Sequence, residues 1–168
     1  MPLHAEMFGN SVMRATPRCT ITLPNAVNET LVSLCSGMAG VRPEEASVRL
    51  TATLTSKQEQ AEQEEWYRFA VSVGPLAWVR LWVDDHRLLD QWSGPHEPTP
   101  TTPSLLPNVS LSSSRPVFVR LDLRPWASWL ALNLTWRRAG EAAPRTVPDE
   151  SLSPSISSQQ VEIGRAHV

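Results

Sequence analysis

The sequence predicts an all-β protein that folds as an antiparallel β-sandwich. Several stretches alternate apolar and polar side chains with a period of two, the period of a strand that buries one side. No stretch shows a helical period, and turn or loop signals separate the alternating stretches at mixed spacing. A chain of 168 residues suits one such domain.

The first part of the chain contains two predicted strands. Residues 1–45 are mostly irregular, but Leu3, Ala5 and Met7 predict a short opening strand before a Gly9-Asn10 turn. Residues 48–55 alternate cleanly and are rich in β-forming Val and Thr, so they predict a longer strand. The charged run at 57–65 has no apolar side and predicts an exposed loop.

A β-hairpin is predicted over residues 78–92, and we expect it at the centre of a sheet. It follows a predicted strand at 66–73 that ends at Gly74-Pro75. Its first strand places Val79, Leu81 and Val83 on one side. The turn-prone run Asp84-Asp85-His86-Arg87 interrupts the alternation, which resumes at 88–92.

Two more strands complete the predicted core. The Pro-rich stretch at 93–107 predicts a loop, because its prolines exclude a central strand. Residues 117–123 and 130–136 then alternate, with a turn around Arg124-Pro125-Trp126 between them. Asp122 is expected on the outward side of its strand.

Composition narrows the class of function. The formal charge is −2 and the pI is near 6.1, so the basic face expected of a nucleic-acid-binding protein is not predicted. An apolar run long enough for a transmembrane helix is absent, so we expect no membrane insertion in this chain. The first ten residues lack the pattern of a signal peptide, which predicts either a cytosolic protein or a chain without its natural N-terminus.

The cysteines and the N-glycosylation sequons are the residues that indicate whether the protein is secreted. Cys19 and Cys35 are either two buried free thiols or one disulfide, and the sequence favours neither. Asn28, Asn108 and Asn133 each begin an Asn-x-Ser/Thr sequon, so they are candidate N-glycosylation sites that favour secretion.

The domain is expected to cover residues 1–154. The polar, Ser-rich stretch at 155–161 predicts a disordered tail. Residues 162–168, Glu-Ile-Gly-Arg-Ala-His-Val, match the in-frame translation of a widely used sequencing-library adapter, so we interpret them as an artefact. The parent chain is then expected to be longer, which makes the missing signal peptide less informative.

Several segments, in order, resemble the protective-antigen (PA-fourteen) domain family, found in the anthrax protective antigen, yeast adhesins and some β-glucosidases. The matching segments span about Leu3 to Pro154 and are LHAEMFGN at 3–10, VRLTATL at 48–54, WYRFAV at 66–71, RLWVDD at 80–85 with LLDQW at 88–92, VFVRLD at 117–122, LNLTW at 132–136 and VPDESL at 147–152. The resemblance implies a β-sandwich of the protective-antigen type that serves as a binding module.

The resemblance also implies where a metal would bind. Sugar-binding members hold calcium with two adjacent aspartates in the loop before the hairpin, and carboxylates suit this ion. Here that loop is Gly74-Pro75-Leu76-Ala77, with no carboxylate, so no cofactor is expected, and calcium stays an open alternative without the expected aspartate pair. Asp84 and Asp85 are the remaining metal candidates, but turn formation is the favoured interpretation.

Tryptophans are the candidate ligand platforms. Trp78, Trp82, Trp126 and Trp129 could stack on sugar rings, although packing is the usual fate of this side chain. Trp66, Trp92 and Trp136 are expected to pack.

The sequence therefore favours a binding protein over an enzyme. A serine-nucleophile motif, a phosphate-binding glycine loop and a zinc-protease motif are all absent. Asp122 and Glu150 are not expected to act as an acid–base pair. We expect a non-catalytic module, carbohydrate-binding or adhesive, from a larger extracellular protein, with a glycan or cell-surface protein as partner. The alternatives are a structural accessory domain of a secreted enzyme such as a glycosidase, and a protein-interaction module.

Overall fold

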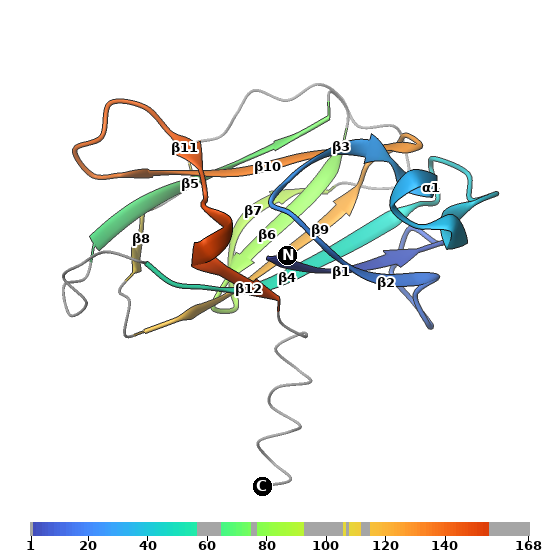
Figure 1. Cartoon of the computed structure of the whole chain (residues 1–168), viewed down its shortest axis with the longest axis horizontal. Coiled ribbons are helices and arrows are strands. Elements are labelled where there is room, and N and C mark those ends of the chain that lie inside the picture. Colours follow the sequence, from blue (N-terminus) through green and yellow to red (C-terminus); the bar gives the residue numbers. More distant parts are fainter. Residues whose placement is uncertain are drawn as a thin grey trace, which may run out of the picture.

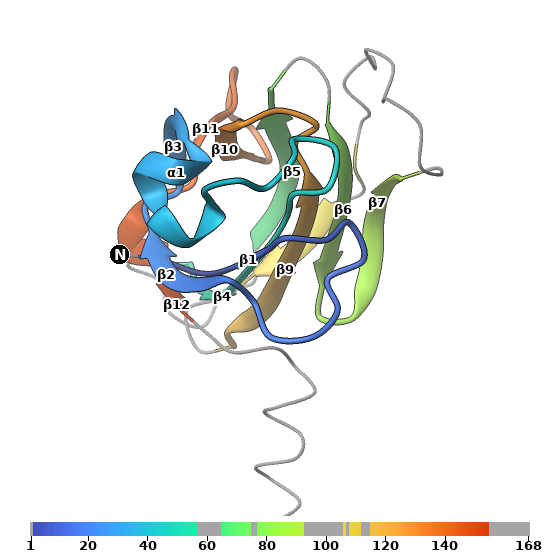
Figure 2. The same cartoon turned by 90° about the vertical axis from the view of Figure 1, so that its right-hand side faces the viewer.

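Two antiparallel sheets pack face to face in the computed structural model of this chain (Figures 1 and 2). The structure describes residues 2–56, 65–74, 77–92, 106, 108–111 and 115–154. The predicted all-β sandwich is confirmed. The loops expected at 57–65 and 93–107 lie mostly outside the described residues, and the tail expected at 155–168 lies wholly outside them.

The larger sheet has seven strands in the order β2-β1-β4-β9-β6-β7, and β12 pairs with β4. Its strands are β1 (Leu3–Phe8), β2 (Cys19–Leu23), β4 (Ser47–Leu54), β6 (Trp78–Val83), β7 (His86–Gln91), β9 (Val117–Arg124) and β12 (Leu152–Pro154). The predicted hairpin exists as β6 and β7, but it forms one edge of the sheet, so its expected central position was wrong. The centre is the long β4–β9 pair.

The smaller sheet has five strands in the order β11-β10-β5-β8, and β3 pairs with β10. Its strands are β3 (Ala26–Thr30), β5 (Glu65–Val73), β8 (Asn108–Leu111), β10 (Trp129–Arg138) and β11 (Arg145–Thr146). Helical structure among the described residues is limited to α1 (Leu31–Leu34) and the short 3₁₀ turns η1 (Ser36–Met38) and η2 (Asp149–Ser151). None of these helices is long enough to cross a membrane.

The core lies between the two sheets and is built from the apolar sides that the alternation predicted. Leu81 is fully buried, and Leu121 and Leu134 are 4% and 3% exposed. Trp136 packs in the core as expected, stacked on Tyr67 with ring centroids 4.4 Å apart. Trp66, by contrast, is 53% exposed, so its expected packing was wrong. Successive side chains of a strand point to opposite sides, so Trp66 points outward because its neighbour Tyr67 on β5 points into the core.

A disulfide closes the segment that looked irregular in sequence. Cys19 at the start of β2 is bonded to Cys35 just after α1, with Cα atoms 6.3 Å apart. Gly37 packs tightly here, because a Cβ on it would lie 2.8 Å from the Cys19 Sγ and 2.9 Å from the Arg18 carbonyl oxygen. Of the two cysteine states that the sequence left open, the structure contains the disulfide.

Candidate ligand-binding site

The turn between β9 and β10 holds Trp126 in an unusual backbone conformation. Its φ is +55°, in the left-handed region that a bulky residue rarely adopts. Pro125 before it is buried, and the Leu31 amide donates to the Ser128 carbonyl at 2.8 Å, so α1 anchors the turn. Strained backbone of this kind persists only where its surroundings hold it, and it gathers at functional sites.

Arg124 supports Trp126 from one side. The guanidinium carbon lies 4.8 Å from the centre of the Trp126 ring, within cation–π range, and 5.9 Å from the Trp92 ring. Its Nη2 donates to the Glu44 carbonyl at 3.0 Å. Arg124 is 5% exposed, and this burial lowers the pKa of its guanidinium from the usual value. A buried cation thus fixes one face of the indole.

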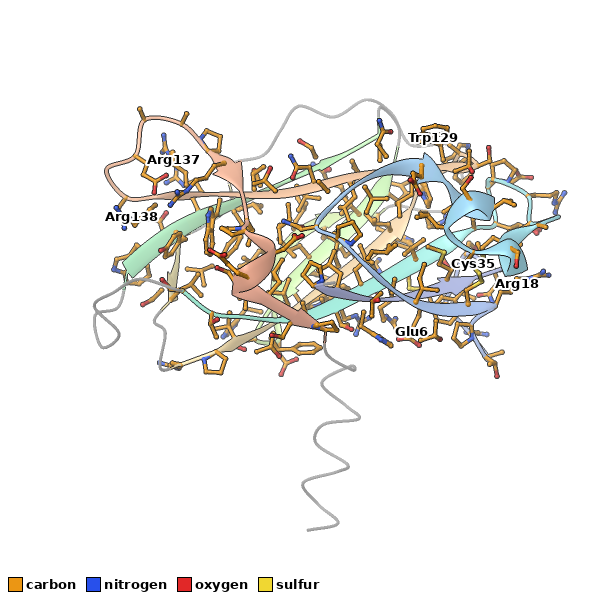
Figure 3. All side chains as sticks on the ribbon, in the orientation of Figure 1. Glu6, Arg18, Cys35, Trp129, Arg137 and Arg138 are labelled. Carbon is orange, nitrogen blue, oxygen red and sulfur yellow. A yellow bond between two sulfur atoms is a disulfide. The ribbon has the colours of Figure 1, made fainter. Side chains whose placement is uncertain are left out.

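Trp129 begins β10 and stays 46% exposed. The ring of Trp129, which is labelled in Figure 3, donates from its Nε1 to the Asn28 Oδ1 on β3 at 2.5 Å. This hydrogen bond fixes the orientation of the ring. Asn28 is a site residue whose role the sequence did not predict, because the hydrogen bond joins positions 101 residues apart.

An apolar pocket of about 320 Å³ lies between these two tryptophans. It is lined by Gly74, Ala77, Leu123, Pro125, Trp126, Ala127, Trp129 and Ala131. None of these side chains is charged. Gly74 and Ala77 come from the loop where the family resemblance places the calcium-binding aspartates, so the pocket occupies that end of the sandwich with an aromatic lining instead.

The other two predicted tryptophan platforms lie away from this pocket. Trp78 is 5% exposed and is therefore buried against its neighbours. Trp82 is half-buried on the outer side of β6, where the Arg120 guanidinium covers its ring at 4.4 Å. The four candidates thus separate into one pair at the pocket and one pair on the larger sheet.

Asp84 and Asp85 form the turn of the hairpin. Their φ angles are +48° and +65°, which suit the turn of a two-residue hairpin. The Asp84 Oδ1 accepts from the Phe118 amide at 2.8 Å, so this carboxylate ties the turn to β9. No group of three or more metal-type side chains converges among the described residues.

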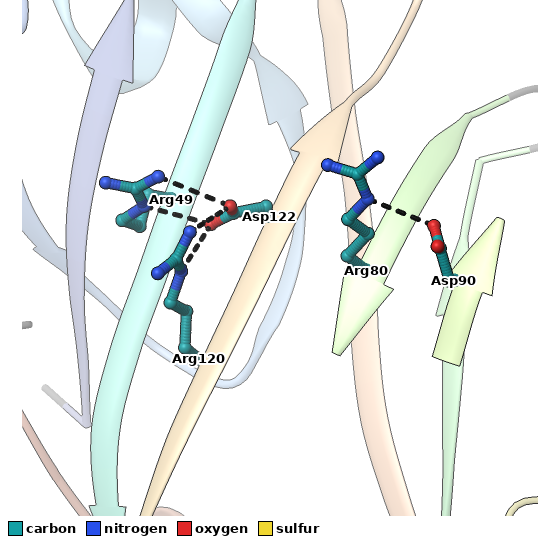
Figure 4. A network of polar contacts seen from close by, with 5 residues as sticks. All are labelled: Arg49, Arg80, Asp90, Arg120 and Asp122. Carbon is teal, nitrogen blue, oxygen red and sulfur yellow. Dashed lines mark hydrogen bonds and ion pairs between the residues drawn. The ribbon is translucent and has the colours of Figure 1, made fainter. Parts of the chain in front are cut away.

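Asp122 lies on the outer side of β9, as predicted, but it is only 4% exposed. Two arginines cover it: the Arg49 Nε donates to it at 3.0 Å and the Arg120 Nη2 at 2.8 Å (Figure 4). This carboxylate is a structural partner of arginines, and Glu150 on η2 is not among its bonded partners.

Comparisons with known proteins place the fold. No family model matches the sequence, and no curated protein sequence matches it significantly. An anti-sigma factor domain-containing protein from Clostridium clariflavum has a TM-score of 0.65 and 20% identity, covering 94% of this chain and 48% of that chain. This chain therefore spans about half the length of that protein.

Two separate PA14 domains match over nearly their full length. The PA14 domain of the MpAFP antifreeze protein has a TM-score of 0.60 and 9% identity, covering 92% of both chains. The PA14 sugar-binding domain of an RTX adhesin has a TM-score of 0.60 and 15% identity, covering 92% of this chain and 98% of that one. The chain therefore has a protective-antigen-type (PA14) fold, as the sequence motifs predicted.

Proposed function

We propose that this PA14-type sandwich is a non-catalytic module that binds carbohydrate at the Trp126–Trp129 pocket without calcium. The observation that carries the proposal is Trp126, held in a strained conformation beside the exposed Trp129 at one end of the fold. Fixed indole rings offer large apolar faces at little entropic cost, and sugar rings have apolar faces that can stack on them. A structural neighbour described as a sugar-binding domain supports this class of ligand.

The lining of the pocket supports the proposed independence from calcium. The described lining residues carry no carboxylate, and oxygen ligands are what calcium requires. The same lining supports a non-catalytic role, because it contains no titratable side chain that could act as general acid or base.

An extracellular location of the parent protein belongs to the same proposal. Disulfides persist in oxidising compartments, and the Cys19–Cys35 bond supports such a location. The three sequons support it as well.

A glycan array probed with unglycosylated, oxidised protein tests the proposal. We expect retention of a subset of glycans, unchanged by chelator, and weakened about tenfold or more by Trp126→Ala or Trp129→Ala, since aromatic anchors carry much of a binding free energy. Trp66→Ala is the matched control, because Trp66 is comparably exposed, 53% against 46% for Trp129, but lies at the start of β5, whereas the pocket residue Gly74 follows the end of that strand. Retention of no glycan, or loss of retention with chelator, would contradict the proposal.

A second candidate function is supported by the same pocket. Its lining is almost wholly apolar, which also suits an apolar side chain of a protein partner. A protein-interaction module would show no glycan retention, while binding of partner-derived peptides rich in aliphatic or aromatic residues would still be lost in Trp129→Ala.

A further inference from the structure

All three N-glycosylation sequons of the chain lie in the five-stranded sheet. Asn28 is on β3, Asn133 is on β10 and Asn108 is on β8. The remaining asparagines, Asn10 and Asn25, do not begin a sequon, so the seven-stranded sheet carries none. Positions far apart in sequence are thus gathered into one layer of the sandwich.

The three side chains also project from the same surface of that sheet. Val27, Leu132 and Leu134, the strand neighbours of two of them, are at most 7% exposed and point into the core. Val109 pairs with the buried Tyr67 and packs against the core, so its neighbour Asn108 points outward. Because side chains alternate along a strand, all three asparagines lie on the outer surface of the sheet.

Both strongly exposed tryptophans among the described residues lie on this surface, each beside a sequon. Trp129 bonds to Asn28 through its Nε1. Trp66 lies opposite Ser110, the third residue of the Asn108 sequon, so Asn108 is its diagonal cross-strand neighbour. An indole ring in water leaves a large apolar area exposed, and an adjacent sugar ring would cover it.

Space for sugars exists between Asn28 and Asn133. A shallow depression of about 350 Å³ separates them, and its outward side chains are small: Ala26, Ser72 and Ala131. The Asn133 Oδ1 accepts from the Thr146 Oγ1 at 3.0 Å, and the Asn28 bond also uses Oδ1. Both bonds leave out Nδ2, the atom that carries an N-linked glycan.

We propose that Asn28, Asn108 and Asn133 carry N-linked glycans that together cover the outer surface of the five-stranded sheet. The donor is a lipid-pyrophosphate-linked oligosaccharide of the secretory pathway. The Nδ2 forms a bond to C1 of the first sugar, the C1–O bond to the pyrophosphate breaks, Nδ2 loses one proton, and the lipid pyrophosphate leaves. The glycans at Asn28 and Asn133 share the depression, while the outer surface of the seven-stranded sheet stays bare. This proposal does not rest on carbohydrate binding by the pocket.

Site occupancy is tested by secreting the full 168-residue chain from mammalian cells behind a heterologous signal sequence. Intact mass before and after peptide N-glycosidase, with mapping of the Asn-to-Asp conversions, should show three modified positions. Thr135→Ala should remove the glycan at Asn133, whereas Thr135→Ser should keep it; Ser110→Ala and Ser110→Thr form the same pair for Asn108. An unmodified Asn28 or Asn133 in the secreted protein, or secretion of only unglycosylated chains, would overturn the proposal.

Coverage is tested on the folded glycoprotein by hydroxyl-radical footprinting before and after enzymatic removal of the glycans. Labelling of Trp129 and Trp66 should rise severalfold on removal. Labelling of Trp82, on the outer side of the seven-stranded sheet, should stay unchanged and serves as the internal control. Equal labelling of Trp129 and Trp66 with and without glycans, or a matching rise at Trp82, would contradict a cover confined to one sheet.

Discussion

At the scale of single residues, Trp126 is a site residue whose type, but not its backbone conformation, could be predicted from the sequence. Its type and its neighbour Trp129 marked it as a candidate platform, and the structure brings both to one pocket. Its left-handed backbone could not be predicted, because the turn depends on contacts with other parts of the chain, such as the Leu31 amide that donates to the Ser128 carbonyl, and on the Arg124 guanidinium over the ring. Trp78 has the same residue type and a strand position, yet its neighbours bury it.

The strain at Trp126 predicts an unusual order of stability. Trp126→Gly should be more stable than Trp126→Ala by about 1 kcal/mol, because glycine adopts a positive φ without steric cost. Urea unfolding of the two variants measures the difference. A more stable alanine variant would show that the backbone at this position is not left-handed in solution.

Leu81 is a position where the side chain, and not the backbone, determines the stability of the fold. It is fully buried in β6, so Leu81→Asp would place an unpaired charge in the core and destabilise the fold by about 4 kcal/mol or more. Leu81→Met keeps the volume and should cost less than about 1.5 kcal/mol. Thermal unfolding of both variants decides the matter, and an unchanged midpoint in Leu81→Asp would show that β6 faces the other way.

At the scale of elements, the outer side of the seven-stranded sheet carries a row of alternating charge. Glu6, Arg49, Asp122, Arg80 and Asp90 lie directly opposite one another across β1, β4, β9, β6 and β7. Opposite charges in such cross-strand pairs stabilise a register, and a slip of one residue would break every pair. The row thus fixes the strand alignment from outside, as the core does from inside.

The row predicts unequal roles for its two aspartates. Asp122→Ala should cost about 3 kcal/mol, because it leaves Arg49 and Arg120 without their shared, buried partner. Asp90→Ala should cost less than about 1 kcal/mol, because the side chains of its pair with Arg80 are each 34% exposed. Equal losses in denaturant unfolding would contradict the importance of burial.

The same scale shows which strands the sequence predicts. The long central strands β4, β9 and β10 have clean alternation, since each buries one side along most of its length. The strands β2, β3, β8, β11 and β12 escaped prediction. They are two to five residues long, and they are strands because a distant neighbour supplies their hydrogen bonds. The hairpin was recognisable, but its edge position depends on the order of strands, which local sequence does not encode.

At the scale of the whole molecule, the sandwich combines a continuous core with one covalent clip. This disulfide joins Cys19 at the start of β2 to Cys35 just after α1, 16 residues apart in sequence. The helix α1 in turn anchors the turn that contains Trp126. The sequence could not predict the bond, because nothing local brings the two cysteines within reach. The fold class could be predicted, because alternation and loop spacing are properties of the whole chain.

The clip predicts a redox-dependent stability. The Cys19→Ala/Cys35→Ala variant should lose about 3 kcal/mol of unfolding free energy, the loss expected for opening a loop of this length. Reducing the wild type with a thiol should lower its denaturation midpoint to that of the variant, whose own midpoint should not change. A midpoint that is insensitive to reduction would contradict the stabilising role of the bond.

Asn28, a proposed N-glycosylation site, is hydrogen-bonded to Trp129, which lines the pocket proposed to bind free sugar. A glycan tethered there would meet the pocket at the effective concentration of an attached ligand, in the millimolar range. The attached glycan would then compete with free sugar for the pocket. Protein made in bacteria, without the Asn28 glycan, would then bind added sugar more tightly than glycosylated protein from secretory cells. Enzymatic trimming of that one oligosaccharide would restore the tighter binding.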